Sequence, residues 1–135
     1  MTIEEARDYH AEQINTYAET AADMVTAMTM TNMEEGAGIA IAARQAGIPS
    51  VISFTVETDG KLPTGQSLKD AIMAVYEASG SAPAYSMING AHRQHFTYLL
   101  EPGAAWMVRM KGIRANASRM SHEELDACTE LDDGD

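Results

Sequence analysis

Short apolar runs alternate with capped helical patterns along this chain, and that alternation constrains its fold more than any other feature. The clearest run covers residues 50–56 and is rich in β-branched and aromatic side chains. Similar runs predict strands near residues 24–29, 84–89 and 112–116. The runs are nearly continuous in their apolar character, which is typical of parallel strands covered by helices. The sequence therefore predicts an α/β fold with four parallel strands.

Helical patterns fill the intervals between the runs, and most of them carry start or stop signals. Thr2 and Ser121 are expected N-caps, each with a glutamate three residues later, which is the capping-box spacing. Gly47 and Gly80 are expected to end two of the helices, since glycine is favoured just past a helix. Helices are expected over residues 2–21, 33–46, 67–79 and 91–100, with a helical turn at 107–111 and a last helix from Ser121.

The length of 135 residues suits one domain, which we expect to span residues 1–135. Acids outnumber bases 20 to 9, which disfavours binding to nucleic acids and to anionic membranes. The longest uncharged stretch, residues 78–91, is shorter than the roughly 20 residues that cross a bilayer. We therefore expect no nucleic-acid partner and no membrane partner.

Two features favour a cytoplasmic location. The first ten residues carry acids where a signal peptide would carry a basic and then an apolar stretch. Cys128 is the one cysteine, so an internal disulfide is excluded and a reducing compartment is consistent. Residues 123–135 hold seven acids and no Lys or Arg, which indicates a solvated helix and tail, with an acidic interaction tail as the alternative.

Familiar phosphate-binding and hydrolase motifs are absent from the sequence. Gly36 and Gly38 lie inside a helical pattern, so they predict close helix packing in place of a phosphate loop. The chain has ten methionines, and four of them cluster around the first expected strand: Met24, Met28, Met30 and Met33. Flexible thioethers fill irregular cores, and a methionine-lined surface for copper or a promiscuous partner is the alternative.

Short segments in a characteristic order cover nearly the whole chain. They are Tyr9-His10 with Gln13, Ala22-Asp23-Met24-Val25-Thr26, Ile52-Ser53-Phe54-Thr55-Val56, Asp59-Gly60-Lys61-Leu62 with Gly65, Met87-Ile88-Asn89 with Ala91-His92, Arg114-Ala115-Asn116-Ala117-Ser118 and Leu131-Asp132-Asp133-Gly134-Asp135. In this order and spacing, the sequence resembles the homocysteine S-methyltransferase family.

The resemblance implies a fold and an activity. The family is a zinc-dependent (β/α)₈ TIM barrel that moves a methyl group from S-methylmethionine, betaine or a methylfolate to the sulfur of homocysteine, giving methionine. A complete barrel is typically about 250 residues long, so this chain resembles half of one. By the order of its motifs it matches about strands four to seven with their helices, without the first three strands and the eighth.

The zinc ligands of the family have no counterpart in this chain. In the family, three cysteines hold zinc, which binds the substrate sulfur as a thiolate. One of them follows an asparagine after the sixth strand, where this chain has Asn89 and then Gly90. The other two are adjacent in a Gly-rich turn after the eighth strand, which is expected beyond Asp135. We therefore expect no metal ligand in this chain. Met28-Thr29 also stands where the family often has Glu-Thr, whose glutamate contacts the amino acid, so the resemblance implies that this contact is missing here.

Polar residues at the expected strand ends are the candidate substrate-binding residues, because barrel enzymes place their sites at these ends. They are Thr29, Ser53, Asn89, His92 and Asn116. His92 and His95 are three residues apart, which would put both on one face of the helix expected over 91–100. They could form a metal pair, shape the homocysteine pocket or be ordinary hydrogen-bonded histidines. Cys128 is expected to be a packed or exposed helix cysteine.

Two functions therefore follow for the chain. It is either part of a homocysteine S-methyltransferase, inactive alone because the zinc cysteines are missing, or a non-catalytic half-barrel that serves as a binding or assembly module. The resemblance implies homocysteine and a methyl donor as partners, and zinc as the cofactor of the complete family. Open strand edges near residues 24–29 and 113–116 are expected to drive self-association.

Overall fold

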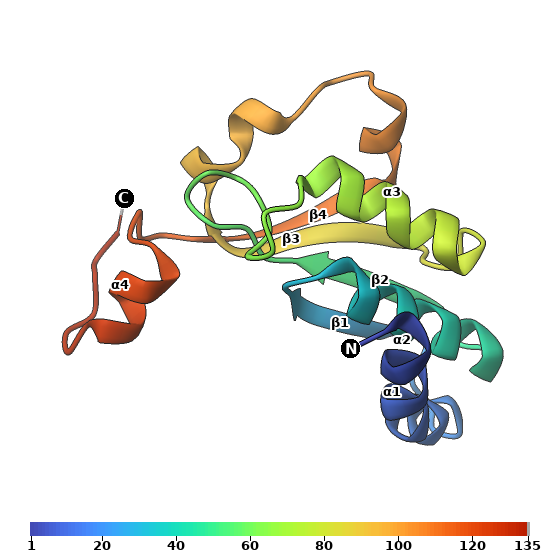
Figure 1. Ribbon diagram of the computed structural model, residues 1–135. Helices are drawn as coiled ribbons and strands as arrows, with labels where there is room; N and C mark the ends of the chain where they lie inside the picture. Colours follow the sequence, from blue (N-terminus) through green and yellow to red (C-terminus); the bar gives the residue numbers. More distant parts are fainter. Residues whose placement is uncertain (135) are drawn as a thin grey trace.

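The structure is a computed structural model that describes residues 1–134. Asp135, the last residue of the domain expected over 1–135 and of the motif at 131–135, lies outside the described residues. Four strands form one sheet in chain order, and every neighbouring pair is parallel (Figure 1). They are β1 (Val25–Met30), β2 (Ser50–Phe54), β3 (Tyr85–His92) and β4 (Met110–Asn116). The predicted α/β fold with four parallel strands is confirmed.

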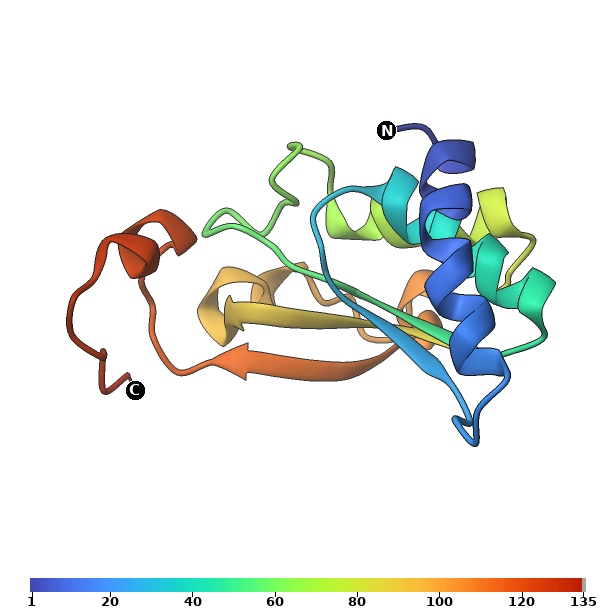
Figure 2. The ribbon, with the colours of Figure 1, turned by 90° about the horizontal axis from the view of Figure 1, so that it is seen from below.

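Three long helices cover one face of the sheet, and a short fourth helix follows β4 (Figures 1 and 2). They are α1 (Ile3–Ala18), α2 (Met33–Ala46), α3 (Leu68–Ser79) and α4 (His122–Ala127). The expected caps form, since Thr2 and Ser121 make capping boxes and Ser67 accepts a hydrogen bond from the Asp70 N–H. Gly47 and Gly80 end α2 and α3 in the left-handed conformation that glycine adopts without a steric penalty.

The centre of the sheet is β2, whose five residues are all buried. Ile52 and Phe54 point toward the helices, because both lie against Gly36 of α2. Side chains alternate between the faces of a strand, so Val51 and Ser53 point to the other face. No described helix covers that other face, and its polar residues line up toward the carboxyl ends of the strands.

The contact between α1 and α2 depends on a glycine. A Cβ atom built on Gly38 would lie 2.6 Å from the Ala6 Cβ and 2.6 Å from the Arg7 backbone nitrogen. The predicted close helix packing at this glycine is therefore confirmed. His10 of α1 and Glu35 of α2 add a polar contact between the same helices, with 3.0 Å between Nε2 and Oε1.

The prediction of a helix over residues 91–100 is wrong. β3 continues through His92, and two short 3₁₀ turns follow, Arg93–His95 and Thr97–Leu99. The start of this segment stays extended because His92 of β3 still pairs in register with Asn116 of β4. The two 3₁₀ turns do not join into one helix because Phe96, which lies between them, is buried in the core and has non-helical backbone angles. The turn expected at 107–111 is also shifted, to the 3₁₀ helix Ala105–Arg109.

The methionines around β1 divide between core and surface. Met30 and Met33 pack against the core, whereas Met24 and Met28 are 40% and 36% exposed. Core filling is therefore confirmed for only part of the cluster. None of the described helices is both long and apolar enough to pass through a membrane.

Replacing Gly38 by alanine should destabilise the protein. Alanine favours a helix by about 1 kcal/mol over glycine, but the clash with the α1 backbone should cost about 1–3 kcal/mol more than that gain. Thermal unfolding followed by circular dichroism should show a lower midpoint for Gly38→Ala. The control is Gly36→Ala, whose new methyl group would meet side-chain atoms and no backbone, the nearest being the Ile52 Cγ2 at 3.1 Å. Equal midpoints for the two variants would contradict the packing argument.

Candidate functional site

The carboxyl ends of the strands surround an open hollow of about 340 Å³. Parallel strands all end at one edge of a sheet, and in Figure 2 the arrowheads of β3 and β4 point toward α4 at that edge. The hollow is lined by Thr29, Thr55, Asn89, Gly90, Asn116, His122, Leu125 and Asp126. Polar groups from all four strand ends therefore share one space with the first turn of α4.

The Asn89 side chain ties the ends of three strands together. Its Oδ1 accepts hydrogen bonds from the Thr29 N–H at 2.9 Å and from the Ser53 hydroxyl at 2.6 Å. Its Nδ2 donates to the Thr29 hydroxyl at 2.8 Å. A backbone N–H can only donate, so these partners fix the orientation of the amide. Asn89 is 6% exposed and Ser53 is fully buried, so this network is the floor of the hollow.

Thr29 has an unusual backbone conformation, with φ of +63°. A β-branched residue rarely adopts this left-handed region, where the strain is of order 1–3 kcal/mol. The strain coincides with an irregularity in the pairing of β1 with β2, between Ala27 and Met30. The two hydrogen bonds between Thr29 and the Asn89 side chain hold Thr29 in this conformation. A strained residue therefore presents its hydroxyl at the rim of the hollow.

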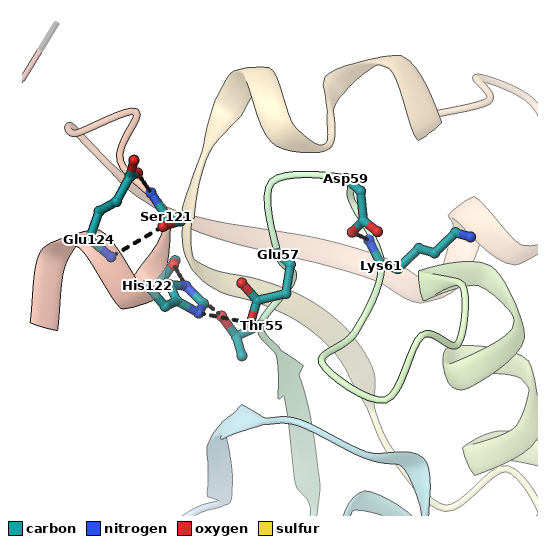
Figure 3. A network of polar contacts seen from close by, with 8 residues as sticks. Thr55, Glu57, Asp59, Lys61, Ser121, His122 and Glu124 are labelled. Atoms are coloured by element: carbon teal, nitrogen blue, oxygen red, sulfur yellow. Dashed lines mark hydrogen bonds and ion pairs between the residues drawn. The ribbon is translucent and has the colours of Figure 1, made fainter.

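His122 anchors α4 over the ends of β2 and β3 (Figure 3). Its Nε2 lies 2.6 Å from the Gly90 carbonyl oxygen and 3.4 Å from the Thr55 hydroxyl oxygen. A carbonyl oxygen only accepts, so Nε2 carries a proton and donates it. Nδ1 lies 3.4 Å from the Glu57 Oε1, which forms an ion pair when the ring is charged. One imidazole thus joins α4 to three groups at the strand ends.

The chain after α4 folds back onto the segment after β4. The Ser118 hydroxyl donates to Asp132 Oδ2, and the Gly134 N–H donates to Asp132 Oδ1 at 3.0 Å. These two bonds hold the pKa of the Asp132 carboxyl below its ordinary value, the Ser118 bond contributing more. The pKa of Glu124 is also lowered, chiefly by the Ser121 backbone N–H of the capping box. Two motifs of the family resemblance, at 114–118 and 131–135, therefore contact each other.

The structure brings together four of the five candidate residues taken from the sequence. Thr29, Asn89 and Asn116 line the hollow, and Ser53 lies beneath it through its bond to Asn89. His92 is buried at the end of β3 and does not line the hollow. Its Nδ1 accepts from the Gln94 N–H at 3.2 Å, and its ring centroid lies 5.8 Å from that of His95. The expectation that both rings project from one helix is wrong.

Sequence reasoning assigned no chemistry to His122, and it gave Thr55 and Asp126 no place in the site. Thr55 follows β2 directly. Its alternation with Phe54 indicates which face of the sheet its side chain points to, but it does not indicate a hydrogen-bond partner. Nothing in the spacing around Ser121 predicts that the side chain of the next residue, His122, points back to the sheet. Only the folded position of α4 reveals that contact.

The residues at the hollow do not offer a zinc site. Gly90 has no side-chain ligand atom, and Cys128 is exposed at the end of α4 with its Sγ 3.6 Å from the Met120 Sδ. Within residues 1–134, no three His, Cys, Asp or Glu side chains are grouped so that they could hold a metal ion. A protein zinc site normally uses three or four such ligands. The family's metal therefore finds no ligand set in this part of the chain.

A second hollow of about 380 Å³ lies away from the candidate residues. It separates the loop after β2 from the 3₁₀ turns after β3, and its walls include Lys61, Lys69, Tyr98 and Trp106. The Tyr98 hydroxyl donates to the Asp59 carbonyl at 2.6 Å, which holds these two connections together. None of the polar groups at the strand ends lines it, so we place the candidate site at the other hollow.

The comparisons with known proteins bear directly on this site. The family model described as Homocysteine S-methyltransferase matches residues 1–130. The chain belongs to this family. A search of individually curated proteins gave no match. Family membership supports a methyltransferase role.

Replacing Asn89 by alanine should destabilise the protein by about 2–3 kcal/mol, because three hydrogen bonds are lost and two partners stay behind. The matched control is Ser53→Ala, which removes one of those bonds and should cost about 1 kcal/mol. Urea unfolding followed by fluorescence gives both free energies of unfolding. A loss for Asn89→Ala no larger than that for Ser53→Ala would show that the amide does not organise the strand ends.

Replacing His122 by alanine should release α4 from the sheet while leaving the rest of the fold intact. Hydrogen exchange of the backbone amides of residues 122–128 should become at least about tenfold faster, since opening a helix end that has lost its anchor costs less free energy. His10→Ala is the control, because that ring pairs with Glu35 on the helical face. Unchanged exchange in α4 would rule out the anchoring role.

Proposed function

We propose that this chain forms strands four to seven of a TIM barrel in a homocysteine S-methyltransferase, as one half-barrel domain over residues 1–135. The family match over residues 1–130 carries the proposal. Four parallel strands in chain order, with helices on one face, support it. So does the hollow at the carboxyl ends of the strands, where barrel enzymes keep their sites.

In this proposal the hollow binds the amino-acid end of homocysteine. Thr55 accepts from the His122 ring, which leaves its own hydroxyl proton available to a substrate carboxylate. The Asn116 amide can donate to the same group, and the Asp126 carboxylate suits the substrate ammonium. Asn89, Ser53 and Thr29 hold one another and act by positioning the rim.

The complete protein would transfer a methyl group to the homocysteine sulfur from a donor of the S-methylmethionine, betaine or methylfolate type. This chain supplies part of the pocket and no zinc ligand, so we propose that it is inactive alone. A free thiol has a pKa of roughly 8.5 and is mostly protonated at neutral pH, so the reaction needs an activating group that residues 1–134 do not provide. The single cysteine is consistent with work in the reducing cytoplasm.

Gly90 also supports a second candidate, a non-catalytic half-barrel that binds or assembles. A cysteine side chain at this position would begin 3.3 Å from the Thr55 hydroxyl, beside the residues of the hollow. The backbone there has φ of +69°, which suits glycine and strains any other residue. The flanking DNA discriminates between the two. Strands one to three upstream and a Gly-Gly-Cys-Cys turn downstream favour the methyltransferase.

The chain and its Gly90→Cys variant should both fail to retain zinc after dialysis, and both should fail to form methionine from homocysteine with any of the three donor types. One cysteine supplies one ligand of three, so the variant should not gain activity. Zinc is measured by elemental analysis and methionine by mass spectrometry. Stoichiometric zinc or clear turnover by the unmodified chain would overturn the proposal of inactivity.

Binding is the second readout of the same proposal. Titration with L-homocysteine should shift the amide signals of Thr29, Thr55 and Asn116 in a two-dimensional NMR spectrum, and the Asn116→Ala variant should weaken that response. Leucine, a similar amino acid without a thiol, tests whether the sulfur contributes. Shifts confined to residues away from the hollow would favour the assembly module.

A further inference from the structure

The two edges of the sheet differ in what covers them. α1 lies alongside β1, the strand at one edge of the sheet (Figure 2). The side chains of the two elements enclose a groove of about 220 Å³. We call this the β1 groove. It is lined by His10, Gln13, Ile14 and Tyr17 of α1, Val25, Thr26, Ala27 and Met30 of β1, and Ile39 of α2. A strand added beside β1 would therefore lie beneath a helix that is already in place.

The opposite edge has a strand without a helix. Ile113 of β4 pairs in register with Ile88 of β3, so the two side chains point to the same face. Ile88 is fully buried there, whereas Ile113 is 49% exposed. The connection before β4 forms 3₁₀ turns, and its Val108 is 70% exposed. The helix-side face of β4 is thus apolar and uncovered.

Charge makes the two edges complementary. Residues 1–24, which hold α1 and the turn before β1, contain six acids and one arginine. Residues 105–120, which hold β4, contain four bases and no acid. Lys111 and Arg114 of β4 are exposed, and so is Glu12 of α1, next to the β1 groove. The net charge of −11 makes two copies repel each other overall, whereas these local opposite charges favour an approach of the basic edge of one copy to the acidic edge of the other.

We propose that two copies of this chain pair head to tail, with β4 of each copy lying in the β1 groove of the other. α1 then covers the exposed Ile113 of the partner, and both open edges gain backbone hydrogen bonds. Four strands from each copy close into a parallel barrel of eight strands, a number at which side chains just fill the interior. The pairing rests on the two edges of the sheet in residues 1–134 and on the second candidate function, the assembly module, because the further strands of a complete barrel would occupy the same edges.

The closed pair also completes the candidate site. In residues 1–134 the hollow is lined from the ends of four strands, of which β1 and β4 form the edges of the sheet. Head-to-tail pairing sets two such rims around one barrel mouth. This mouth then presents Thr29, Thr55, Asn89 and Asn116 twice, related by a two-fold axis.

The test uses the full chain, two single variants and a matched control. Sedimentation velocity across micromolar to millimolar concentrations should show a dimer for the unmodified chain. Ile113→Glu and Tyr17→Glu place a charge at β4 and in the β1 groove, and each should weaken dimerisation about tenfold or more, a change of about 1.4 kcal/mol or more. Met73→Glu alters a side chain of similar exposure (41%) on α3, away from both edges, and should leave the dimer intact. Circular dichroism checks that each variant is folded.

Mixing the two weakened variants separates the possible pairings. In a head-to-tail pair, one copy with Ile113→Glu and one with Tyr17→Glu retain one unaltered β4–β1 contact, so the mixture should recover dimer. A dimer broken by only one of the two variants would mean that like edges pair, which overturns the proposal. A monomer at all concentrations would overturn it, and so would polymers that lengthen with concentration, because the pair must close.

Discussion

Parallel pairing is the constraint on which the rest of this molecule depends. A parallel strand cannot be reached by a tight turn, so each connection must cross back along the sheet, and all strands end at the same edge. Here the crossings through α2 and α3 occupy one face, which leaves the carboxyl ends of β1, β2 and β3 in contact. That geometry lets one amide, Asn89, bond to residues 36 and 60 positions away in the chain.

The parts predicted well from sequence are those governed by local signals. α2 begins and ends at Met33 and Ala46 as expected, because an Asn32 cap and Gly47 mark its limits. The connection after β3 was not predictable in the same way. Its helix-like spacing is overridden by the burial of Phe96 and by the pairing of His92 with β4, and both depend on the rest of the fold. Tertiary contacts outweigh propensity most easily in short segments.

The candidate site follows the same division. Strand ends could be located from the sequence, so Thr29, Ser53, Asn89 and Asn116 were found together. His122 was missed because its partners, Gly90 on β3 and Glu57 in the loop after β2, are distant in the sequence and carry no common motif. Family membership is a property of the whole match over residues 1–130, whereas the chemistry of the site depends on single side chains. Fold and chemistry are separable properties of a chain.

The left-handed Thr29 has a consequence for the order in which the sheet can form. Its strained backbone is held by hydrogen bonds to a residue 60 positions later, so the end of β1 has no stable conformation until β3 has docked. Bringing such distant residues together costs loop-closure entropy, which only the later contacts repay. The end of β1 therefore becomes fixed only when β3 docks, although β1 is the first strand in the chain.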